Sequence, residues 1–165
     1  RFIVSKYLAA LVFTAFILMV LVTSTFLLSY ALFGTGDLVV FLEGLSFFES
    51  REALQRLILA FLTGSLTMVF YAVVSLTLAV LLQEATVTWI VAALFLIGTT
   101  LLLRFDFHSE GLNTYFFPKL TDTWQYLFYP EIPAGVILKK NAALGAYTLL
   151  FAGIGVWVFQ KRDVK

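Results

Sequence analysis

The chain has 165 residues, of which 61% are hydrophobic, 17% aromatic and 13% charged, and it has a formal net charge of +1 and no Cys. A soluble domain is about 45–50% apolar and about 25% charged, so this composition nearly excludes a soluble enzyme and indicates lipid as the solvent for most of the chain. The small net charge argues against a general attraction to nucleic acid, and the absence of Cys excludes disulfides, thiolate metal sites and a Cys nucleophile.

Four apolar segments are long enough to cross a bilayer, whose core of about 30 Å needs about 20 helical residues. The predicted spans cover residues 7–33, 57–82, 87–103 and 142–159. They are predicted as helices because lipid tolerates only helices or closed barrels, and period-2 alternation is absent. The first span is longer than a perpendicular crossing needs, so we expect it to tilt or to extend into water. The expected fold is an all-α membrane protein with one transmembrane domain, residues 1–165.

The first two connections between spans differ in character. Residues 34–56 carry several charges and contain a helix-start signal, Ser46-x-x-Glu49, with Ser50 as a rival cap. The segment SREALQRL is interpreted as an amphipathic lead-in that continues into the second span. Residues 83–86 form a tight turn between the second and third spans.

The third connection, residues 104–141, is long and aromatic and holds all three prolines. Trp and Tyr favour the membrane–water boundary. Thr121 or Asp122 could cap a short helix that Pro130 would end, and the apolar IPAGVIL is too short to span. We expect residues 121–138 to form short helical pieces at, or dipping into, the outer leaflet. An ordinary external loop with an aromatic belt is the alternative.

The candidate residues of this external, re-entrant link are Trp124, Tyr126, Pro130, Pro133 and Gly135. Irregular backbone at membrane depth is tolerated only where protein or water satisfies it. We therefore expect residues 130–135 to pack on the third and fourth spans rather than on lipid.

Four spans place both termini on one side of the membrane. The basic residues on that side are Arg1, Lys6, Lys161, Arg162 and Lys165, at higher density than the six basic residues that share the other side with eight acidic ones. By the positive-inside rule the termini are expected to be cytoplasmic, although the raw counts are nearly tied.

The sequence has none of the common catalytic motifs. It contains no P-loop, G-x-G-x-x-G, H-E-x-x-H or G-x-S-x-G pattern. Asp106, His108 and Glu110 alternate and could share one face of an extended segment, but three ligands on a loop are a weak metal site and a solvated loop is the preferred interpretation. No charge lies centrally in a span, which argues against a proton-driven pump and against an intramembrane enzyme.

Small and hydroxyl residues form rows at helical spacing in all four spans, and the rows of the second and third spans supply the candidate residues. The rows are Thr63, Thr67, Tyr71 and Ser75 in the second span, and Thr86, Ala93 and Thr100 in the third. In lipid such residues let helices approach closely and bond to one another. Two interpretations stay open: helix packing alone, or a weakly polar path for an amphiphilic substrate.

The layout and two motifs resemble a known family. The opening RFIVSKYLAAL is similar to the segment entering the third span of ABC transporter permeases of the type-2 exporter class, where an Arg-containing stretch and a Ser/Gly-Lys pair lead into a long helix. The close, AYTLLFAGIGVWVFQKRDVK, is similar to that class's last span, whose tail has an aromatic residue, one or two basic residues and Asp. The resemblance covers the whole chain in layout and only its two ends in sequence.

The family has six spans, with a cytoplasmic coupling helix before the third, a tight cytoplasmic turn between the fourth and fifth, and an outer re-entrant helical element between the fifth and sixth. The four spans here would be its third to sixth. The resemblance thus implies the C-terminal part of a longer permease, in a prokaryotic plasma (inner) membrane.

The resemblance also implies partners. Two permease copies or homologues would pair with two ABC ATPase subunits that bind ATP and Mg, while this chain binds no cofactor and no metal and performs no catalysis. The ATPase-coupling candidates are Arg1, Phe2, Ser5, Lys6 and Glu84. The expected function is export of an unidentified substrate. The alternative is a non-transporting four-helix membrane scaffold or assembly subunit.

Overall fold

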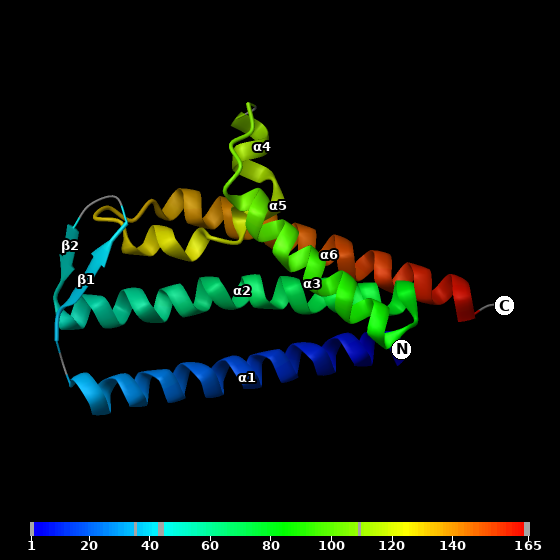
Figure 1. Ribbon diagram of the computed structural model, residues 1–165, viewed down its shortest axis with the longest axis horizontal. Helices are drawn as coiled ribbons and strands as arrows, with labels where there is room; N and C mark the ends of the chain where they lie inside the picture. Colours follow the sequence, from blue (N-terminus) through cyan, green and yellow to red (C-terminus); the bar gives the residue numbers. More distant parts are fainter. Residues whose placement is uncertain (1, 35, 43–44, 109, 164–165) are drawn as a thin grey trace.

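The computed structural model describes residues 2–34, 36–42, 45–108 and 110–163, which form long helices joined by short elements (Figure 1). In chain order the elements are α1 (Phe2–Phe33), β1 (Leu38–Phe41), β2 (Leu45–Phe48), α2 (Ser50–Leu82), α3 (Ala85–Leu103), α4 (Glu110–Tyr115), α5 (Phe117–Leu120), the 3₁₀ helix η1 (Thr123–Phe128) and α6 (Ala134–Asp163). Four of them, α1, α2, α3 and α6, are long and apolar enough to cross a membrane. The chain is therefore an all-α membrane protein, as its composition predicts.

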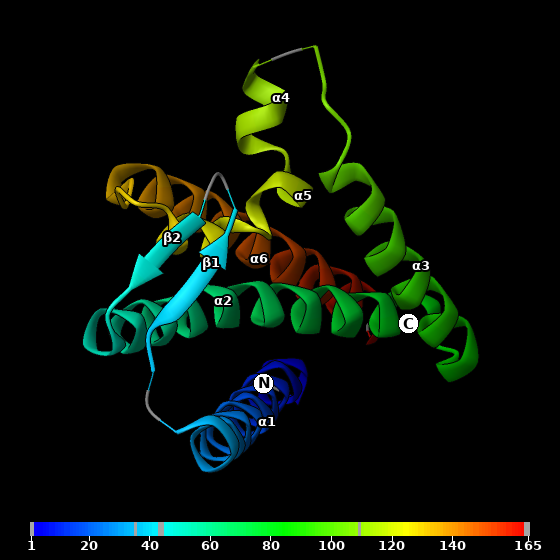
Figure 2. The ribbon, with the colours of Figure 1, turned by 60° about the vertical axis from the view of Figure 1, so that its left-hand side comes forward.

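Three of the four spans are longer than a bilayer crossing requires. Helices α1, α2 and α6 contain 32, 33 and 30 residues. At 1.5 Å per residue they are about 45–50 Å long, against a hydrocarbon core of about 30 Å, so they must tilt or project beyond the lipid. Helix α3 has 19 residues and lies obliquely to α2 (Figures 1 and 2).

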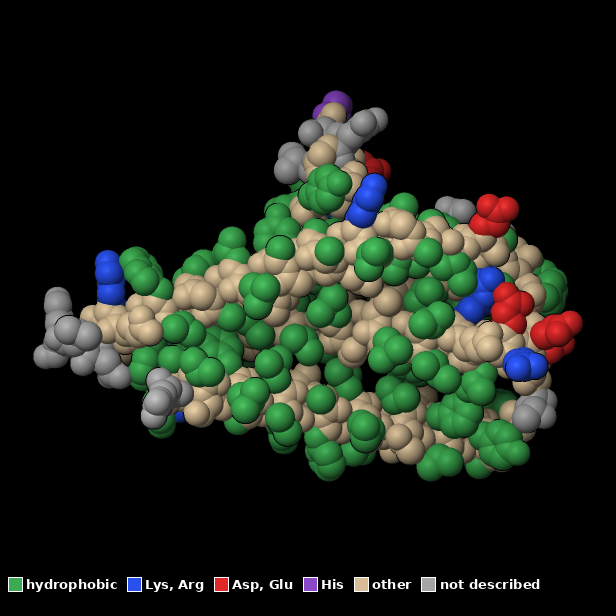
Figure 3. Space-filling view, turned by 180° about the vertical axis from the view of Figure 1, so that it is seen from behind, with side chains coloured by type: hydrophobic (Ala, Val, Ile, Leu, Met, Phe, Trp, Pro, Cys, Tyr) green, Lys and Arg blue, Asp and Glu red, His purple; other side chains and the backbone are tan. Residues whose placement is uncertain are grey.

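Hydrophobic side chains cover the middle of the molecule, and charged side chains gather near its ends and around the projecting α4 (Figure 3). Large apolar side chains along α1 are exposed, for example Phe16 at 64% and Met19 at 71%. Contiguous apolar surface of this extent is rare on soluble monomers. This belt is the surface that faces lipid.

The first turn of α1, the α2–α3 turn and the end of α6 lie at the same end of the bundle (Figure 1), as four spans require. Gln83 makes the turn in the left-handed conformation, with φ of 58°. The turn is shorter than predicted because α3 begins at Ala85, so Thr86 is already helical. The Arg162 guanidinium donates to two of the last carbonyls of α2, at 2.8 and 3.1 Å, and so caps that helix.

Helix α2 is the central helix, because it contacts α1, α3, α6 and η1. We call the place where α1, α2 and α6 meet the three-helix junction; it consists of Tyr7, Thr77, Phe151 and Gly155. The Tyr7 hydroxyl lies 2.8 Å from Thr77 Oγ1, which lies 3.0 Å from the Phe151 carbonyl oxygen. A Cβ at Gly155 would collide with the Tyr7 hydroxyl. Glycine is therefore needed for this close approach.

The connection between α1 and α2 contains a β-hairpin that the sequence analysis did not predict. Strands β1 and β2 pair antiparallel, with Leu38 opposite Phe48. Leu38 and Val40 point inward and pack on a cluster that includes Ala60 and Leu127, which supplies the packing that a short hairpin needs.

The predicted helix caps in this connection are wrong, although the lead-in is confirmed. Ser46 lies in β2, and Ser50 is the first residue of α2. Glu49 occupies the N-cap position and makes no side-chain cap bond. Helix α2 then runs without interruption from SREALQRL into the apolar span, as predicted.

The last span begins earlier than predicted. Residues 134–138, expected to belong to a separate short piece, form the first turns of α6 together with residues 139–141 of the predicted link. Pro133 precedes the helix, and its carbonyl accepts a bond from the Ile137 N–H at 3.1 Å. With no further proline after Pro133, nothing interrupts the helix before its polar tail.

Candidate functional site

The link between α3 and α6 folds back along α2. Three contacts define its register: the Phe117 ring lies 5.9 Å from the Phe70 ring, the Thr121 carbonyl accepts from Thr67 at 3.2 Å, and the Leu127 carbonyl accepts from Arg56 at 2.7 Å. Arg56 and Phe70 are separated by about 21 Å along the helix axis. The predicted short helix that contains Trp124 and Tyr126 is thus present as η1. Helix α5, which was not predicted, precedes it, and both pack on the bundle while α4 stands out from it (Figures 1 and 2).

Local hydrogen bonds let these short helices lie against apolar neighbours. Thr121 Oγ1 donates to the Pro118 carbonyl at 2.7 Å, and Thr123 Oγ1 donates to the Leu120 carbonyl at 2.6 Å. Both threonines are buried, so carbonyls at the helix ends are satisfied without water. Asp122 occupies the predicted N-cap position of η1 but makes no side-chain cap bond.

Arg56 fastens the end of the link to α2. Its side chain is 8% exposed, and the guanidinium donates to the carbonyls of Leu127 at 2.7 Å and Tyr129 at 2.6 Å. It also pairs with Glu52 at 2.8 Å, one helical turn away, and lies 4.2 Å from the centroid of the Phe48 ring. One cation thereby joins the hairpin, α2 and the end of η1.

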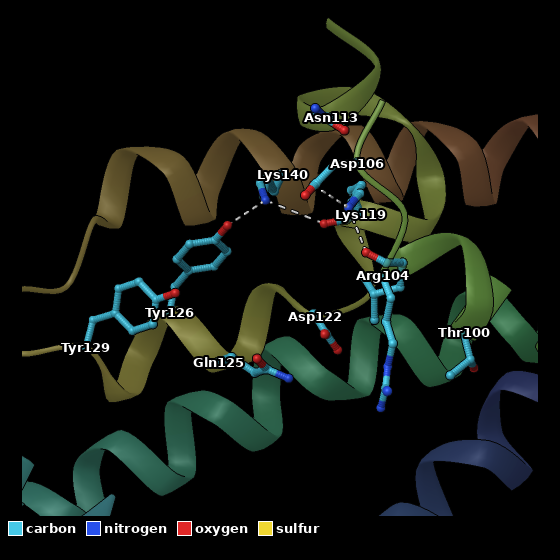
Figure 4. Close-up of a pocket in the computed structure, with 11 residues that line it drawn as sticks. Thr100, Arg104, Asp106, Asn113, Lys119, Asp122, Gln125, Tyr126, Tyr129 and Lys140 are labelled. Atoms are coloured by element: carbon cyan, nitrogen blue, oxygen red, sulfur yellow. Dashed lines mark hydrogen bonds and ion pairs between the residues drawn. The ribbon is translucent and has the colours of Figure 1, made fainter. Parts of the chain in front are cut away.

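A polar pocket of about 500 Å³ lies where the end of α3, the link and the start of α6 meet (Figure 4). We call it the link pocket. Its lining residues are Thr100, Leu103, Arg104, Asp106, Asn113, Lys119, Asp122, Gln125, Tyr126, Tyr129 and Lys140. It thus combines three cationic and two carboxylate side chains on a protein whose surface is mostly apolar.

Lys140 is the most buried cation of the link pocket, at 8% exposure. Its ammonium donates to the Tyr126 hydroxyl at 2.9 Å and to the Lys119 carbonyl at 3.5 Å. Among the residues that the structure describes, it has no carboxylate within ion-pair distance. Lys119 donates to the Leu103 carbonyl at 2.7 Å and lies 3.6 Å from Asp106, whose side chain is 95% exposed.

The remaining charged groups of the link pocket are less tightly held. Arg104 extends away from the Lys119–Asp106 pair (Figure 4), and within the described ranges its guanidinium has no hydrogen bond or ion pair. Burial raises the pKa of the Asp122 carboxyl above its ordinary value, and Lys140 opposes that shift. The pocket therefore has an excess of positive charge.

The coupling candidates lie at the other end of the bundle, where α1 begins; Arg1 is outside the described residues. Phe2 and Ser5 are exposed, and Lys6 lies 4.6 Å from the centroid of the Phe2 ring. Lys6 also lines a groove of about 460 Å³ with residues of α2 and α6. Glu84 is exposed in the adjoining α2–α3 turn.

The predicted polar rows have different surroundings. Thr67 is buried and bonded to the link, while Thr63 donates to a carbonyl of its own helix at 3.0 Å; Tyr71 and Ser75 are half-buried. In the third span, Thr86, Ala93 and Thr100 are exposed, and Thr100 lines the link pocket. Packing is thus observed for Thr67, and a substrate path along either row stays a prediction.

The predicted link residues divide into packed and exposed groups. Trp124 lies against Gly64 of α2 and 6.3 Å from the Phe128 ring, and Tyr126 lines the link pocket. Pro130 and Gly135 are exposed and Pro133 is half-buried. The prediction that residues 130–135 pack on the third and fourth spans is wrong, because all of them except the half-buried Pro133 are exposed. Leu127 and Phe128, just before them, make the buried contacts with α2 and α6.

One member of the Asp106–His108–Glu110 cluster, the Glu110 side chain, lies outside the described residues. His108 is exposed, and Asp106 lies near Lys119. Within the described part of the chain, no group of three His, Asp or Glu side chains could hold a metal ion.

The sequence analysis missed Arg56, Lys119 and Lys140 as site residues. A signal was present: each is a basic residue beside an apolar segment, where a charge without a partner would be costly. No protein-family model matches the chain, and neither the curated proteins nor the solved structures gave a significant match.

Proposed function

We propose that the chain is the membrane-spanning part of an ATP-driven ABC permease of the type-2 exporter class, with ATP hydrolysed by a partner chain. The observation that carries the proposal is the link between α3 and α6, in which α5 and η1 pack back on the bundle after the projecting α4. The resembled class has a re-entrant helical element at this place in its order of spans. The tight α2–α3 turn and the shared position of the two chain ends agree with the third to sixth spans of that class.

The physical task of such a subunit is to convert closure of the ATPase into movement of helices between two states. Helices α1, α2 and α6 are suited to this task, because the three-helix junction ties them together near the end that holds Lys6. At that end, Lys6 and Arg162 line a groove that is open to a partner. We place this end in the cytoplasm of a prokaryotic cell, where the ATPase would dock.

The test is purification of the full-length protein from its native membrane in mild detergent. We expect a P-loop ATPase chain to co-purify in fixed ratio and the complex to hydrolyse ATP with Mg. Lys6→Glu should lower transport-linked ATPase activity while the spans remain inserted. The matched control is Lys139→Glu, which changes another exposed lysine, at the start of α6, and it should leave that activity unchanged.

Two results would overturn the proposal. A complex without any P-loop chain and without ATPase activity would instead fit a non-transporting scaffold. An equal effect of Lys6→Glu and Lys139→Glu would remove the groove at the α1 end from the coupling mechanism.

A further inference from the structure

We propose that the link pocket binds an anionic phosphate group at the membrane boundary. The pocket is formed by the end of α3, by α5 and η1, and by the first turns of α6. This inference does not rest on transport, and it would hold equally for a scaffold.

The first argument is the environment of Lys140. Lys140 is 8% exposed, and the hydrogen-bond partners of its ammonium group are neutral: the Tyr126 hydroxyl and a backbone carbonyl. A buried charge is normally paired, yet no carboxylate of the described chain lies within ion-pair distance of Lys140. Tyr126 holds the ammonium at the pocket wall, where an anion would complete its coordination.

The second argument is that two more cations line the same space. Arg104 has a guanidinium with no partner among the described residues, and its planar fork matches two phosphate oxygens. Lys119 is anchored through the Leu103 carbonyl, and its contact with the exposed Asp106 is long, at 3.6 Å. A long ion pair with a fully exposed carboxylate is weak, so Lys119 can exchange Asp106 for a better anion.

The third argument is the charge balance of the pocket wall. Arg104, Lys119 and Lys140 contribute three positive charges, and Asp106 and Asp122 contribute two negative charges, which leaves a formal excess of +1. The raised pKa of Asp122 means that its carboxyl takes up a proton more readily, and a protonated carboxyl does not repel an anion beside it. Phosphate is preferred to a carboxylate because its non-bridging oxygens are strong acceptors, and they leave a tetrahedral centre instead of lying in the single plane of a carboxylate.

The fourth argument is size and place. A volume of about 500 Å³ is typical of small-ligand sites. The pocket lies at the ends of two spans, and its Tyr, Lys and Arg side chains are the types enriched at the lipid headgroup level. A phospholipid headgroup can therefore enter from the surrounding bilayer, and a soluble phosphate offers the same chemistry from water.

The experiment measures thermal stabilisation of the full-length protein in a neutral detergent. Three probes are added separately: dioctanoyl phosphatidylglycerol, dioctanoyl phosphatidylcholine and inorganic phosphate. Since a ligand that binds the folded state raises the unfolding temperature, we expect a rise with phosphatidylglycerol and none with phosphatidylcholine, whose quaternary amine the cations repel. A rise with phosphatidylglycerol alone identifies a lipid site, and a rise with inorganic phosphate identifies the free anion as sufficient.

Variants separate a built site from general attraction to anions. Lys140→Gln and Arg104→Gln should each weaken binding of the effective probe by about tenfold or more, the typical loss of a hydrogen bond to a charged group. Lys139→Gln, the exposed neighbour, should leave the affinity unchanged. Asp122→Asn should tighten binding, because it removes a negative charge from the wall.

The proposal is overturned if neither phosphatidylglycerol nor phosphate stabilises the protein, or if Lys139→Gln weakens binding as much as Lys140→Gln. Should Lys140→Gln fail to fold, Arg104→Gln and Asp122→Asn decide the matter. Among the described residues Arg104 has no side-chain partner whose loss would harm folding, and the opposite sign expected for Asp122→Asn cannot arise from damage to the structure.

Discussion

Replacement of Arg56 by Met tests how the link is held against α2. The guanidinium donates to the Leu127 carbonyl at 2.7 Å and to the Tyr129 carbonyl at 2.6 Å. The substitution keeps an apolar stem of similar length and removes the donors. The carbonyls of Leu127 and Tyr129 then lose their charged donor at positions that water reaches poorly.

The cost follows from these contacts. An acceptor left unsatisfied costs about 1–3 kcal/mol, and here two carbonyls lose their donor. The Glu52 carboxylate is half exposed and is rehydrated when Arg56 is removed, so the lost ion pair adds only about 0.3–0.5 kcal/mol. We therefore expect Arg56→Met to lower the free energy of unfolding by about 3–5 kcal/mol. Glu52→Gln should lower it by less than about 1 kcal/mol.

The assay is thermal unfolding of the full-length protein in mild detergent, together with amide hydrogen exchange. At about 2–4 °C per kcal/mol for a chain of this size, the midpoint should fall by about 6–20 °C. Exchange should rise first over residues 123–133, because that segment loses its attachment. The control is Arg51→Met, an exposed arginine on the same helix. If Arg56→Met matched this control within about 0.5 kcal/mol and left exchange unchanged, the attachment through Arg56 would be refuted.

Three further predictions concern other parts of the molecule. Gly155→Ala should destabilise the protein by about 1–3 kcal/mol, because the added methyl group collides with Tyr7 at the three-helix junction. The control is Gly153→Ala, where a Cβ meets nothing within 4 Å, and it should be neutral or stabilising. Equal thermal unfolding midpoints for the two variants would contradict the close approach at the junction. Because the chain has no Cys, a single Cys at Trp124 should react with a membrane-impermeant thiol reagent in intact cells, and one at Gln83 only after lysis; the reverse pattern would invert the topology. Since the folded state holds the Asp122 proton more tightly than the unfolded state, stability should fall as pH rises from its ordinary pKa of 3.8 through the raised value. Asp122→Asn should remove that fall in the unfolding midpoint, and an unchanged profile would show that Asp122 is not its source.

The spans, the tight turn and the helical nature of the long link were predictable from the sequence. These features depend on local quantities: the length of an apolar run relative to the bilayer, and the positions of prolines. The hairpin was not predictable in this way, because β1 and β2 gain their stability from packing on residues of α2 and η1 that lie far along the chain. The candidate site was likewise predictable only in part. Tyr126 was recognised from its aromatic neighbourhood, whereas the link pocket depends on contacts made across the fold.

Arg56 and Lys140 illustrate what only the tertiary structure decides. In the sequence both are charges at the edge of an apolar segment; in the fold Arg56 meets carbonyls more than 70 residues away, and Lys140 faces a pocket. Thr99 and Thr100 make the same point within one helix, since Thr99 is 2% exposed and Thr100 is exposed. The sequence by itself determines that α3 crosses lipid, because its composition is apolar on all sides. Because α3 is apolar on all sides, its sequence carries almost no signal of which face of the helix turns inward. Packing against α2 sets that face.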